Sequence, residues 1–321
     1  MELCQNTSLI TFNIIAFTTS GNMKDFMFIV FLLMYMTAVS GNLIIATLIC
    51  KVSQLHTPMY FFLCNFSIVE ATYVSTIFPK LLSITVTEDK RISFQGCITQ
   101  LYFFMFSGAA EFLLLTCMAY DRYVAVCTPL QYFLVMRKSI CVVLAAFCLL
   151  FSSFNSLIFS LLISTLLFCN SHDINSFFCD IRSLMALSSS DTKSREIALI
   201  VEDICLVFLA FVLISTSYVY IICAIVKIQS SKGRFKAFSS CSSHLTTVIL
   251  FYGPIMFLYI KPESDQSEDQ DKLLSLLYVI VVPTLNPFVY TLRNKEVIGA
   301  VAKLINISLV NKRQKSIKFN H

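Results

Sequence analysis

Two carboxyl side chains lie inside long apolar stretches of this sequence. Glu70 and Glu111 each have apolar neighbours on both sides. A charged group that faces lipid costs about 3 kcal/mol or more, so both are expected to face inward, toward each other, water or a cation. Two interpretations stay open. The pair is either a sodium-type site coupled to a conformational switch, or a set of protonated carboxyls hydrogen-bonded in the interior.

An arginine directly after an aspartate marks the end of another apolar run, between Met118 and Cys127. An ion pair at that place holds neighbouring helices together, and a freed guanidinium can donate to a docking partner when the helices separate. The triplet Asp121-Arg122-Tyr123 is a weak signal alone. Its position at the inner end of the third of seven apolar runs makes it specific.

A proline follows an asparagine near the end of the last apolar run, in the segment from Asn286 to Tyr290. Proline removes one helical hydrogen bond, which makes Pro287 a hinge candidate. A static kink is the alternative, because proline is tolerated in membrane helices when its freed carbonyl finds a partner.

Enzymatic and metal chemistry have no support in the residue pattern. The four histidines are scattered without ligand spacing, at His56, His172, His244 and His321. The chain is therefore expected to be no enzyme and to need neither metal nor cofactor.

The elements that must position these residues are membrane helices. Of the 321 residues 57% are apolar and 13% charged, with a mean hydropathy of +0.76. Each of seven apolar stretches is long enough to cross a bilayer as a helix. The stretches are 26–50, 58–82, 97–127, 140–168, 197–228, 237–260 and 273–292. The predicted fold class is an all-α membrane protein, a seven-transmembrane helix bundle.

The basic residues predict the orientation of this bundle. Lys and Arg concentrate on one set of connections, which places the amino terminus outside and the carboxyl terminus inside. We therefore expect an extracellular segment 1–25, a bundle 26–292 and a cytoplasmic tail 293–321. Asn6-Thr7-Ser8 is a glycosylation acceptor on the outer side, and apolar and basic residues over 295–309 predict a short amphipathic helix on the inner leaflet.

Two other protein classes are disfavoured. The net charge of +5 comes from basic residues at the ends of apolar runs, which is typical of lipid contact and not of nucleic-acid binding. The two halves show no internal repeat, and the number of spans is odd, so a transporter is not indicated.

Four segments together resemble the odorant-receptor family of rhodopsin-like, G-protein-coupled receptors, of the tetrapod class II type. They match the family in order and spacing over nearly the whole chain. The segments are 55–63 (Leu-His-Thr-Pro-Met-Tyr-Phe-Phe-Leu), 118–127, 236–245 (Lys-Ala-Phe-Ser-Ser-Cys-Ser-Ser-His-Leu) and 283–294.

The resemblance implies a plasma-membrane receptor for a small volatile odorant. It implies signalling through a stimulatory olfactory heterotrimeric G protein to cyclic AMP, and delivery to the surface with an accessory trafficking protein. It also implies a switch facing the G protein, made of Asp121, Arg122, Tyr123, Tyr218, Lys236, His244, Asn286, Pro287 and Tyr290. From the residues alone, a satisfied interhelical histidine is the preferred interpretation of His244.

The resemblance also bears on the cysteines. It supports a disulfide between Cys97 and Cys179 on the oxidising side. Many relatives pair a second loop cysteine at the position of Cys169 with one near Ser189, but this chain has serine there. Cys169 is then either a free thiol or paired with another cysteine, and the sequence leaves both possibilities open.

A ligand cavity is expected in the outer half of the bundle, on the third, fifth, sixth and seventh spans. Mostly apolar side chains imply a small hydrophobic ligand, although simple packing between helices explains each residue equally well. A rhodopsin-like receptor for a non-odorant small molecule outside the nose is the alternative. Helical spacing suggests Phe104, Met105, Gly108, Ala109, Glu202, Leu206, Tyr252, Ile255, Met256, Tyr259 and Val279.

Overall fold

The computed structural model describes residues 10–15, 22–169, 172–260, 276–292 and 297–299. Five of the described helices are long and apolar enough to cross a membrane, by length and composition. They are α1 (Asn22–Lys51), α2 (Pro58–Thr87), α3 (Phe94–Cys127), α5 (Lys138–Ser164) and a continuous helix formed by α7 (Lys193–Asp203), the π-helical turn η4 (Ile204–Phe208) and α8 (Leu209–Lys227).

Two further helices follow in the chain. α9 (Ser231–Ile260) is long but more polar, and the π-helical turn η6 (Leu277–Val281) continues into α11 (Val282–Leu292) as a shorter apolar helix. The predicted fold class of a seven-helix membrane bundle is confirmed, with the predicted spans differing from the helices by a few residues at their ends. Of the predicted amphipathic helix, only 297–299 lie within the described residues, and these are helical.

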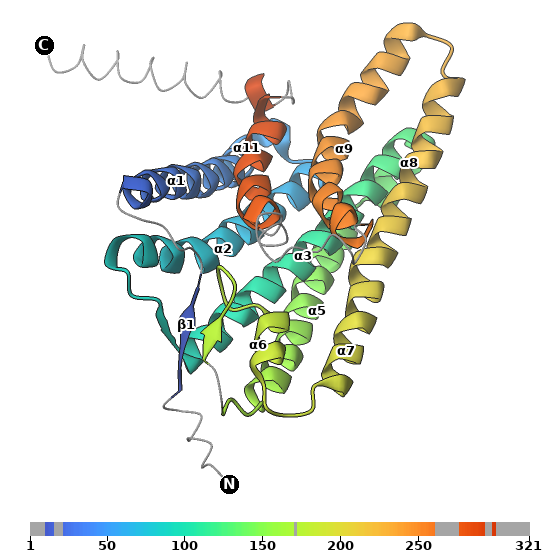
Figure 1. Cartoon of the computed structure of the whole chain (residues 1–321). Helices are drawn as coiled ribbons and strands as arrows, with labels where there is room; N and C mark the ends of the chain where they lie inside the picture. The colour runs from blue at the N-terminus through green and yellow to red at the C-terminus, as the bar shows by residue number, and fades with distance from the viewer. Residues whose placement is uncertain (1–9, 16–21, 170–171, 261–275, 293–296, 300–321) are drawn as a thin grey trace, which may run out of the picture.

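α3 occupies the centre of the bundle. It packs against α2, α5, α8 and α9, whereas α1 packs on α2 and α11. Figure 1 shows α3 running from beside β1 toward the turn that joins α8 to α9. We call the end of the bundle at the start of α3 the disulfide end, after Cys97, and the opposite end the arginine end, after Arg122.

Short elements connect the long helices. At the arginine end these are η2 (Ser53–Leu55), η3 (Pro129–Gln131) and α4 (Tyr132–Val135). At the disulfide end, α6 (Ile181–Leu187) starts with Asp180, whose carboxylate accepts a hydrogen bond from the Ser183 amide at 2.9 Å. A side-chain cap of this kind satisfies one of the unpaired amides of the first helical turn.

A three-stranded sheet covers part of the disulfide end. β1 (Thr11–Ile14) lies between β2 (Arg91–Ser93), which is antiparallel to it, and β3 (Asp173–Ile174), which is parallel. Phe12 is fully buried, and its ring stands edge-on to Phe168 with centroids 5.0 Å apart. The sequence analysis missed this sheet, because strands of two to four residues are too short for an alternating pattern to emerge.

A close approach between α1 and α11 depends on a glycine. A Cβ atom added to Gly41 would lie 2.7 Å from the Cβ of Pro287, inside van der Waals contact. Gly41 therefore allows α1 to lie against the proline of the Asn286–Tyr290 segment, in the half of the bundle toward the arginine end.

Candidate functional site

Arg122 joins α3 to α9 at the arginine end. Its guanidinium is ion-paired with Asp121, with Nε at 2.9 Å from Oδ2, and its Nη1 donates to the Ser240 hydroxyl at 2.9 Å. Asp121 is fully buried, and the Arg122 side chain is only 12% exposed. The predicted ion pair is present within α3, and the hydrogen bond from Arg122 to Ser240 connects the third helix to the sixth.

The short helix α4 supplies a second partner for Asp121. The Tyr132 hydroxyl donates to Asp121 Oδ1 at 2.8 Å. Burial, and next the charge of Asp121, raises the pKa of the Tyr132 phenol, so the hydroxyl keeps its proton and stays a donor at neutral pH. Both carboxylate oxygens of Asp121 are thus engaged.

His244 forms a second link between helices, one turn further into the bundle. Its Nε2 lies 3.1 Å from the Leu115 carbonyl on α3, and its Nδ1 lies 2.8 Å from the Tyr218 hydroxyl on α8. A carbonyl can only accept, so Nε2 carries the hydrogen. The same Tyr218 hydroxyl also reaches the Cys241 carbonyl at 3.3 Å. His244 is fully buried and connects three helices, as a satisfied interhelical histidine does.

Toward the middle of the bundle, Asn286 of α11 donates a hydrogen bond to Glu70 Oε1 on α2. Glu70 and Glu111 are both buried. Within the described residues, no hydrogen-bond partner meets Glu111 Oε1, Asn286 Oδ1 or the hydroxyls of Ser67 and Ser107. The two acidic residues therefore face the interior of the bundle and not lipid, as the sequence predicts.

Two of the predicted switch residues stand apart from these links. Tyr123 packs its ring against Tyr120 and Tyr220, with centroids 6.3 and 5.9 Å away, and lies on the side of α3 facing α8. Lys236 is exposed near the start of α9. Tyr290 is buried next to Phe66, and Pro287 lies against Gly41.

Four of the eleven predicted ligand residues belong to three apolar clusters, where they pack between helices. Phe104 and Val279 belong with the cluster between α2 and η6, Met105 with the cluster under β1, and Tyr252 with the main core. Leu206 and Ala109 are buried, and Met256 is half-buried. The side chains of Ile255 and Tyr259 lie outside the described residues.

Gly108, a predicted ligand position, has open space beside it. Among the described residues, no heavy atom lies within 4 Å of a Cβ built on Gly108. Phe104, one turn earlier on α3, contacts the ring of Phe178 with centroids 4.5 Å apart. Phe178 comes from the segment before α6, so that segment borders this face of α3.

Glu202 accepts a hydrogen bond that connects the fourth membrane helix, α5, to the fifth, which begins with α7. Asn155 on α5 donates to Glu202 Oε1 at 2.6 Å, and the neighbouring Asp203 is ion-paired with Arg182 of α6 at 2.9 Å. Tyr252 on α9 donates to the Val207 carbonyl of η4 at 3.4 Å. These contacts join α5, α6 and α9 to the fifth helix around its π-helical turn.

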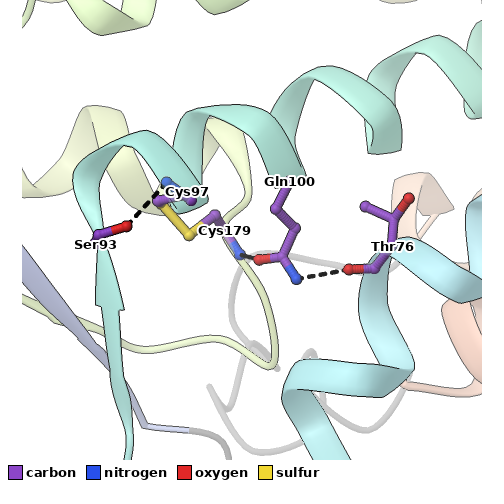
Figure 2. Close-up of a disulfide and its surroundings, with 6 residues drawn as sticks. Thr76, Ser93, Cys97, Gln100 and Cys179 are labelled. Carbon is purple, nitrogen blue, oxygen red and sulfur yellow. Dashed lines mark hydrogen bonds between the residues drawn. A yellow bond between two sulfur atoms is a disulfide. The ribbon is translucent and has the colours of Figure 1, made fainter.

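The predicted disulfide is present at the start of α3. Cys97 and Cys179 are bonded, with Cα atoms 5.4 Å apart. Figure 2 shows Gln100 beside them, where its Oε1 accepts from the Cys179 amide and its Nε2 donates to the Thr76 carbonyl, both at 2.9 Å. Gln100 thus ties the bridged loop to α2 as well as to α3.

Of the two possibilities left open for Cys169, the structure shows the paired one, because Cys169 is disulfide-bonded. Serine at position 189 removes the partner cysteine that many relatives have there, but Cys169 still forms a disulfide. The Ser189 hydroxyl instead accepts from the Cys169 amide at 3.4 Å. The predicted glycosylation site at Asn6 lies outside the described residues.

Several site residues escaped the sequence analysis. Tyr132 and Ser240 complete the Arg122 network, and Gln100 and Asn155 join helices at the disulfide end. Ser240 stands in the quoted segment 236–245, and Tyr132 comes ten residues after Arg122. No pattern in the sequence indicates which polar side chain meets which across the bundle.

Comparison with known protein families gives one match over most of the chain. A family model described as olfactory receptor matches residues 31–307.

Individual proteins match over nearly their whole length. Olfactory receptor 5AR1 of Mus musculus is 47% identical over 307 residues, which is 94% of this chain and 97% of that protein. Olfactory receptor 5AR1 of Homo sapiens is 44% identical, with 94% and 97% covered. The olfactory receptor-like protein OLF3 of Canis lupus familiaris is 45% identical, with 87% and 88% covered.

Proposed function

The chain belongs to the olfactory receptor family, and from this premise we propose that it responds to a small, mostly hydrophobic volatile odorant. The odorant binds in the half of the bundle toward the disulfide end. Binding activates a stimulatory olfactory heterotrimeric G protein at the arginine end and raises cyclic AMP. As an odorant receptor the chain is a multi-pass membrane protein and not an enzyme.

The observation that carries this proposal is the network around Arg122. One guanidinium bonds Asp121 of its own helix and Ser240 of α9, so a side-chain hydrogen bond links the third and sixth helices at the arginine end. Such bonds contribute about 0.5–1.5 kcal/mol each, or up to about 3 kcal/mol with a charged partner. The receptor is proposed to have a resting state, in which Arg122 holds α9, and an active state, in which this hydrogen bond is broken. A ligand that binds the active state only modestly more tightly can shift the equilibrium toward it.

The remaining predicted switch residues have roles that follow from their positions. His244 and Tyr218 close a second link between α3, α8 and α9, which must rearrange when the inner end of α9 moves. Asn286, Pro287 and Tyr290 let α11 adjust against α1 and α2. Tyr123 and Lys236, which stand outside the network, are free to meet the G protein.

An exposed apolar loop at the arginine end supports docking of a protein partner. Leu130 and Phe133, between α3 and α5, are 99% and 87% exposed. Tyr132 of the same loop holds Asp121, so the loop's position depends on the state of the ion pair. Large apolar groups outside the spans mark an interaction surface, and here the proposed partner is the G protein.

The ligand is proposed to contact the face of α3 that carries Gly108, where an added Cβ would meet no heavy atom of the described residues within 4 Å. Phe104, Met105, Tyr252 and Val279 offer apolar and aromatic contacts around that level, and Glu202 offers one polar group. A mostly apolar lining with few polar groups suits a small hydrophobic molecule. Ala109, Leu206, Ile255, Met256 and Tyr259 complete the proposed lining.

We also propose a sodium-type cation site between Glu70 and Glu111. Two carboxylates cannot both stay charged in the membrane interior without a cation or a proton between them. The unpaired oxygens of Ser67, Ser107 and Asn286 supply further neutral ligands. Agonist response should then depend on sodium, and Glu111→Gln should remove that dependence. If the response is the same in sodium and in choline medium, the carboxyls are protonated instead.

The orientation and localisation are proposed together. The amino-terminal segment 1–25, with a glycan on Asn6, lies outside the cell, and the tail 293–321 lies in the cytosol, in a receptor delivered to the plasma membrane by an accessory trafficking protein. Oxidising conditions suit the Cys97–Cys179 bridge on the outer side. Epitope tags at the two ends, stained in intact and permeabilised cells, test this directly.

The decisive experiment is a panel of volatile compounds applied to cells that express the full chain with a trafficking factor, read out as cyclic AMP. A concentration-dependent response to one chemical class supports the proposal. A response to a non-volatile small molecule, with none to volatiles, would instead favour a receptor acting outside the nose.

Arg122→Ala serves as the mechanistic control in the same cells. The response should fall at least tenfold at equal surface expression, because the guanidinium is needed both to hold α9 and to meet the G protein. Lys193→Ala, at the disulfide end, is the matched loss of a positive charge and should leave the response unchanged. An intact Arg122→Ala response would remove Arg122 from the switch.

A further inference from the structure

Cys169, at the end of the segment that follows α5, has a disulfide partner that can be identified by elimination. It is disulfide-bonded, yet every other cysteine within the described ranges is accounted for. Cys97 and Cys179 are bonded to each other, and the rest are free thiols. The sequence has a single cysteine outside those ranges, Cys4. We infer that Cys4 and Cys169 form a second disulfide, which fastens the amino-terminal segment to the loop between α5 and α6.

The position of β1 places Cys4 within reach of Cys169. β1 runs parallel to β3, and the Asn13 amide donates to the His172 carbonyl at 2.8 Å. Ile10 is buried in the same apolar cluster as Phe168, the residue directly before Cys169. Cys4 precedes Ile10 by six residues, and six extended residues span about 20 Å. Six residues are therefore long enough for Cys4 to reach Cys169.

The second disulfide gives the loop an attachment on each side of β3. Cys179 follows β3 and is bonded to α3, whereas Cys169 precedes β3 and is bonded to the amino-terminal segment. β1 itself is four residues long and is held by a few backbone hydrogen bonds and the ring of Phe12. Short strands of this kind are marginal alone, and a crosslink restricts the detached states that compete with them.

The chemistry requires an oxidant on the same side as the Cys97–Cys179 bridge. The two thiols lose two protons and two electrons, and one S–S bond forms between them. The electrons reduce the disulfide of a thiol oxidoreductase of the secretory compartment to a dithiol. Both bridges lie at the disulfide end, so one compartment supplies the oxidant for both.

Peptide mapping of the full-length receptor, purified from mammalian cell membranes, tests the pairing. Free thiols are blocked with N-ethylmaleimide, the glycan is removed, and the unreduced protein is digested with chymotrypsin. Cleavage after Phe168 and Phe177 separates Cys169 from Cys179. A Cys4 peptide linked to a Cys169 peptide, lost on reduction, is the expected result. The Cys97–Cys179 pair is the internal control, and Cys4 or Cys169 carrying N-ethylmaleimide would overturn the inference.

Serine variants give an independent readout. Cys4→Ser, Cys169→Ser and the double variant should lower surface receptor by the same several-fold factor, because each removes the same bond. Cys4→Ser leaves the acceptor Asn6-Thr7-Ser8 intact, and Cys205→Ser, at an exposed free thiol, is the matched control. Additive losses, or no loss in Cys4→Ser, would contradict the shared bond.

A rescue variant distinguishes loss of the bond from loss of the residue. The Ser189 hydroxyl lies 3.4 Å from the Cys169 amide, so a thiol at position 189 falls beside Cys169. Cys4→Ser combined with Ser189→Cys should restore surface receptor and give a Cys169–position 189 linked peptide. If the bond between Cys169 and position 189 forms but the surface level stays low, the surface level depends on the bond to the amino-terminal segment and not on a bond within the loop. Absence of both would contradict the placement of Cys169.

Discussion

The arginine end and the disulfide end of the bundle are held together by different kinds of contact. At the arginine end, hydrogen bonds from the side chains of Arg122, Tyr132 and His244 connect residues of different helices. At the disulfide end, a covalent bridge, backbone pairing of three strands and the buried ring of Phe12 fix the connecting segments.

This difference separates the part that must move from the part that must keep its shape. Hydrogen bonds of about 1 kcal/mol each can break and re-form as a population shifts between two states. A disulfide and a packed aromatic cluster restrict the loop that borders α3, including Phe178 beside Phe104. A receptor that binds at one end and signals at the other is expected to combine these two kinds of contact.

The largest expected effect comes from breaking the covalent contact. Cys97→Ser should destabilise the protein by about 2–5 kcal/mol, which is enough to remove most receptor from the cell surface. Cys205→Ser, at an exposed free thiol, is the matched control and should reach the surface normally. Flow cytometry of intact cells with an amino-terminal tag measures both. Equal surface levels for the two variants would show that the disulfide end does not depend on this bridge.

A smaller effect is expected where α1 meets α11. Gly41→Ala places a Cβ 2.7 Å from the Cβ of Pro287, and overpacking of this kind costs about 1–3 kcal/mol. Gly253→Ala is the control, because no heavy atom of the described residues lies within 4 Å of its added Cβ. The melting temperature of detergent-solubilised receptor should fall for Gly41→Ala only. If the melting temperature fell for both variants, the helices would be sensitive to any glycine substitution, and the contact with Pro287 would not be the cause.

Tyr132→Phe sharpens the comparison from the arginine end. It removes the hydroxyl that donates to Asp121 and leaves the Asp121–Arg122 pair in place. The loss of about 1 kcal/mol should raise basal cyclic AMP about fivefold while surface expression stays normal. Tyr220→Phe removes an exposed hydroxyl and should change neither quantity. Unchanged basal signalling in Tyr132→Phe would mean that the loop does not hold the resting state.

The sequence predicts the two ends unequally well. The spans follow from apolar length, and Asp121, Arg122 and Asn286 stand out because polar residues are rare within such runs. The same rarity predicts that Glu70 and Glu111 face inward, and the structure agrees.

Contacts between distant segments carry no comparable signal. The bond from Tyr132 to Asp121, the Gln100 link from Cys179 to Thr76 and the pairing of β1 with β3 depend on where helices end and how loops return. The family resemblance leaves open whether Cys169 is paired, because this chain has Ser189 where many relatives have the partner cysteine, and the structure shows that Cys169 is bonded.

An exposed ion pair at the disulfide end provides a test of how little polar contacts matter there. Lys24 of α1 is paired with Glu88, which follows α2. The Lys24 ammonium lowers the pKa of the Glu88 carboxyl, so the pair stabilises the fold above the ordinary carboxyl pKa and is lost as pH falls through the lowered value. Solvent screens an exposed pair, and Lys24→Met should barely change the melting temperature at neutral pH.

The smallest expected effect lies in the backbone of Glu88. It caps α2 with φ of 59°, in the left-handed region that glycine adopts without cost, and its amide donates to the Ile84 carbonyl. Glu88→Ala should lower the melting temperature no more than Lys24→Met does, because each substitution removes the same ion pair. The melting temperature of Glu88→Gly should be higher than that of Glu88→Ala. Both variants lose the ion pair, but only glycine adopts the left-handed backbone conformation without steric cost. If Glu88→Gly melted below Glu88→Ala, the Lys24 contact and not the turn would fix the end of α2.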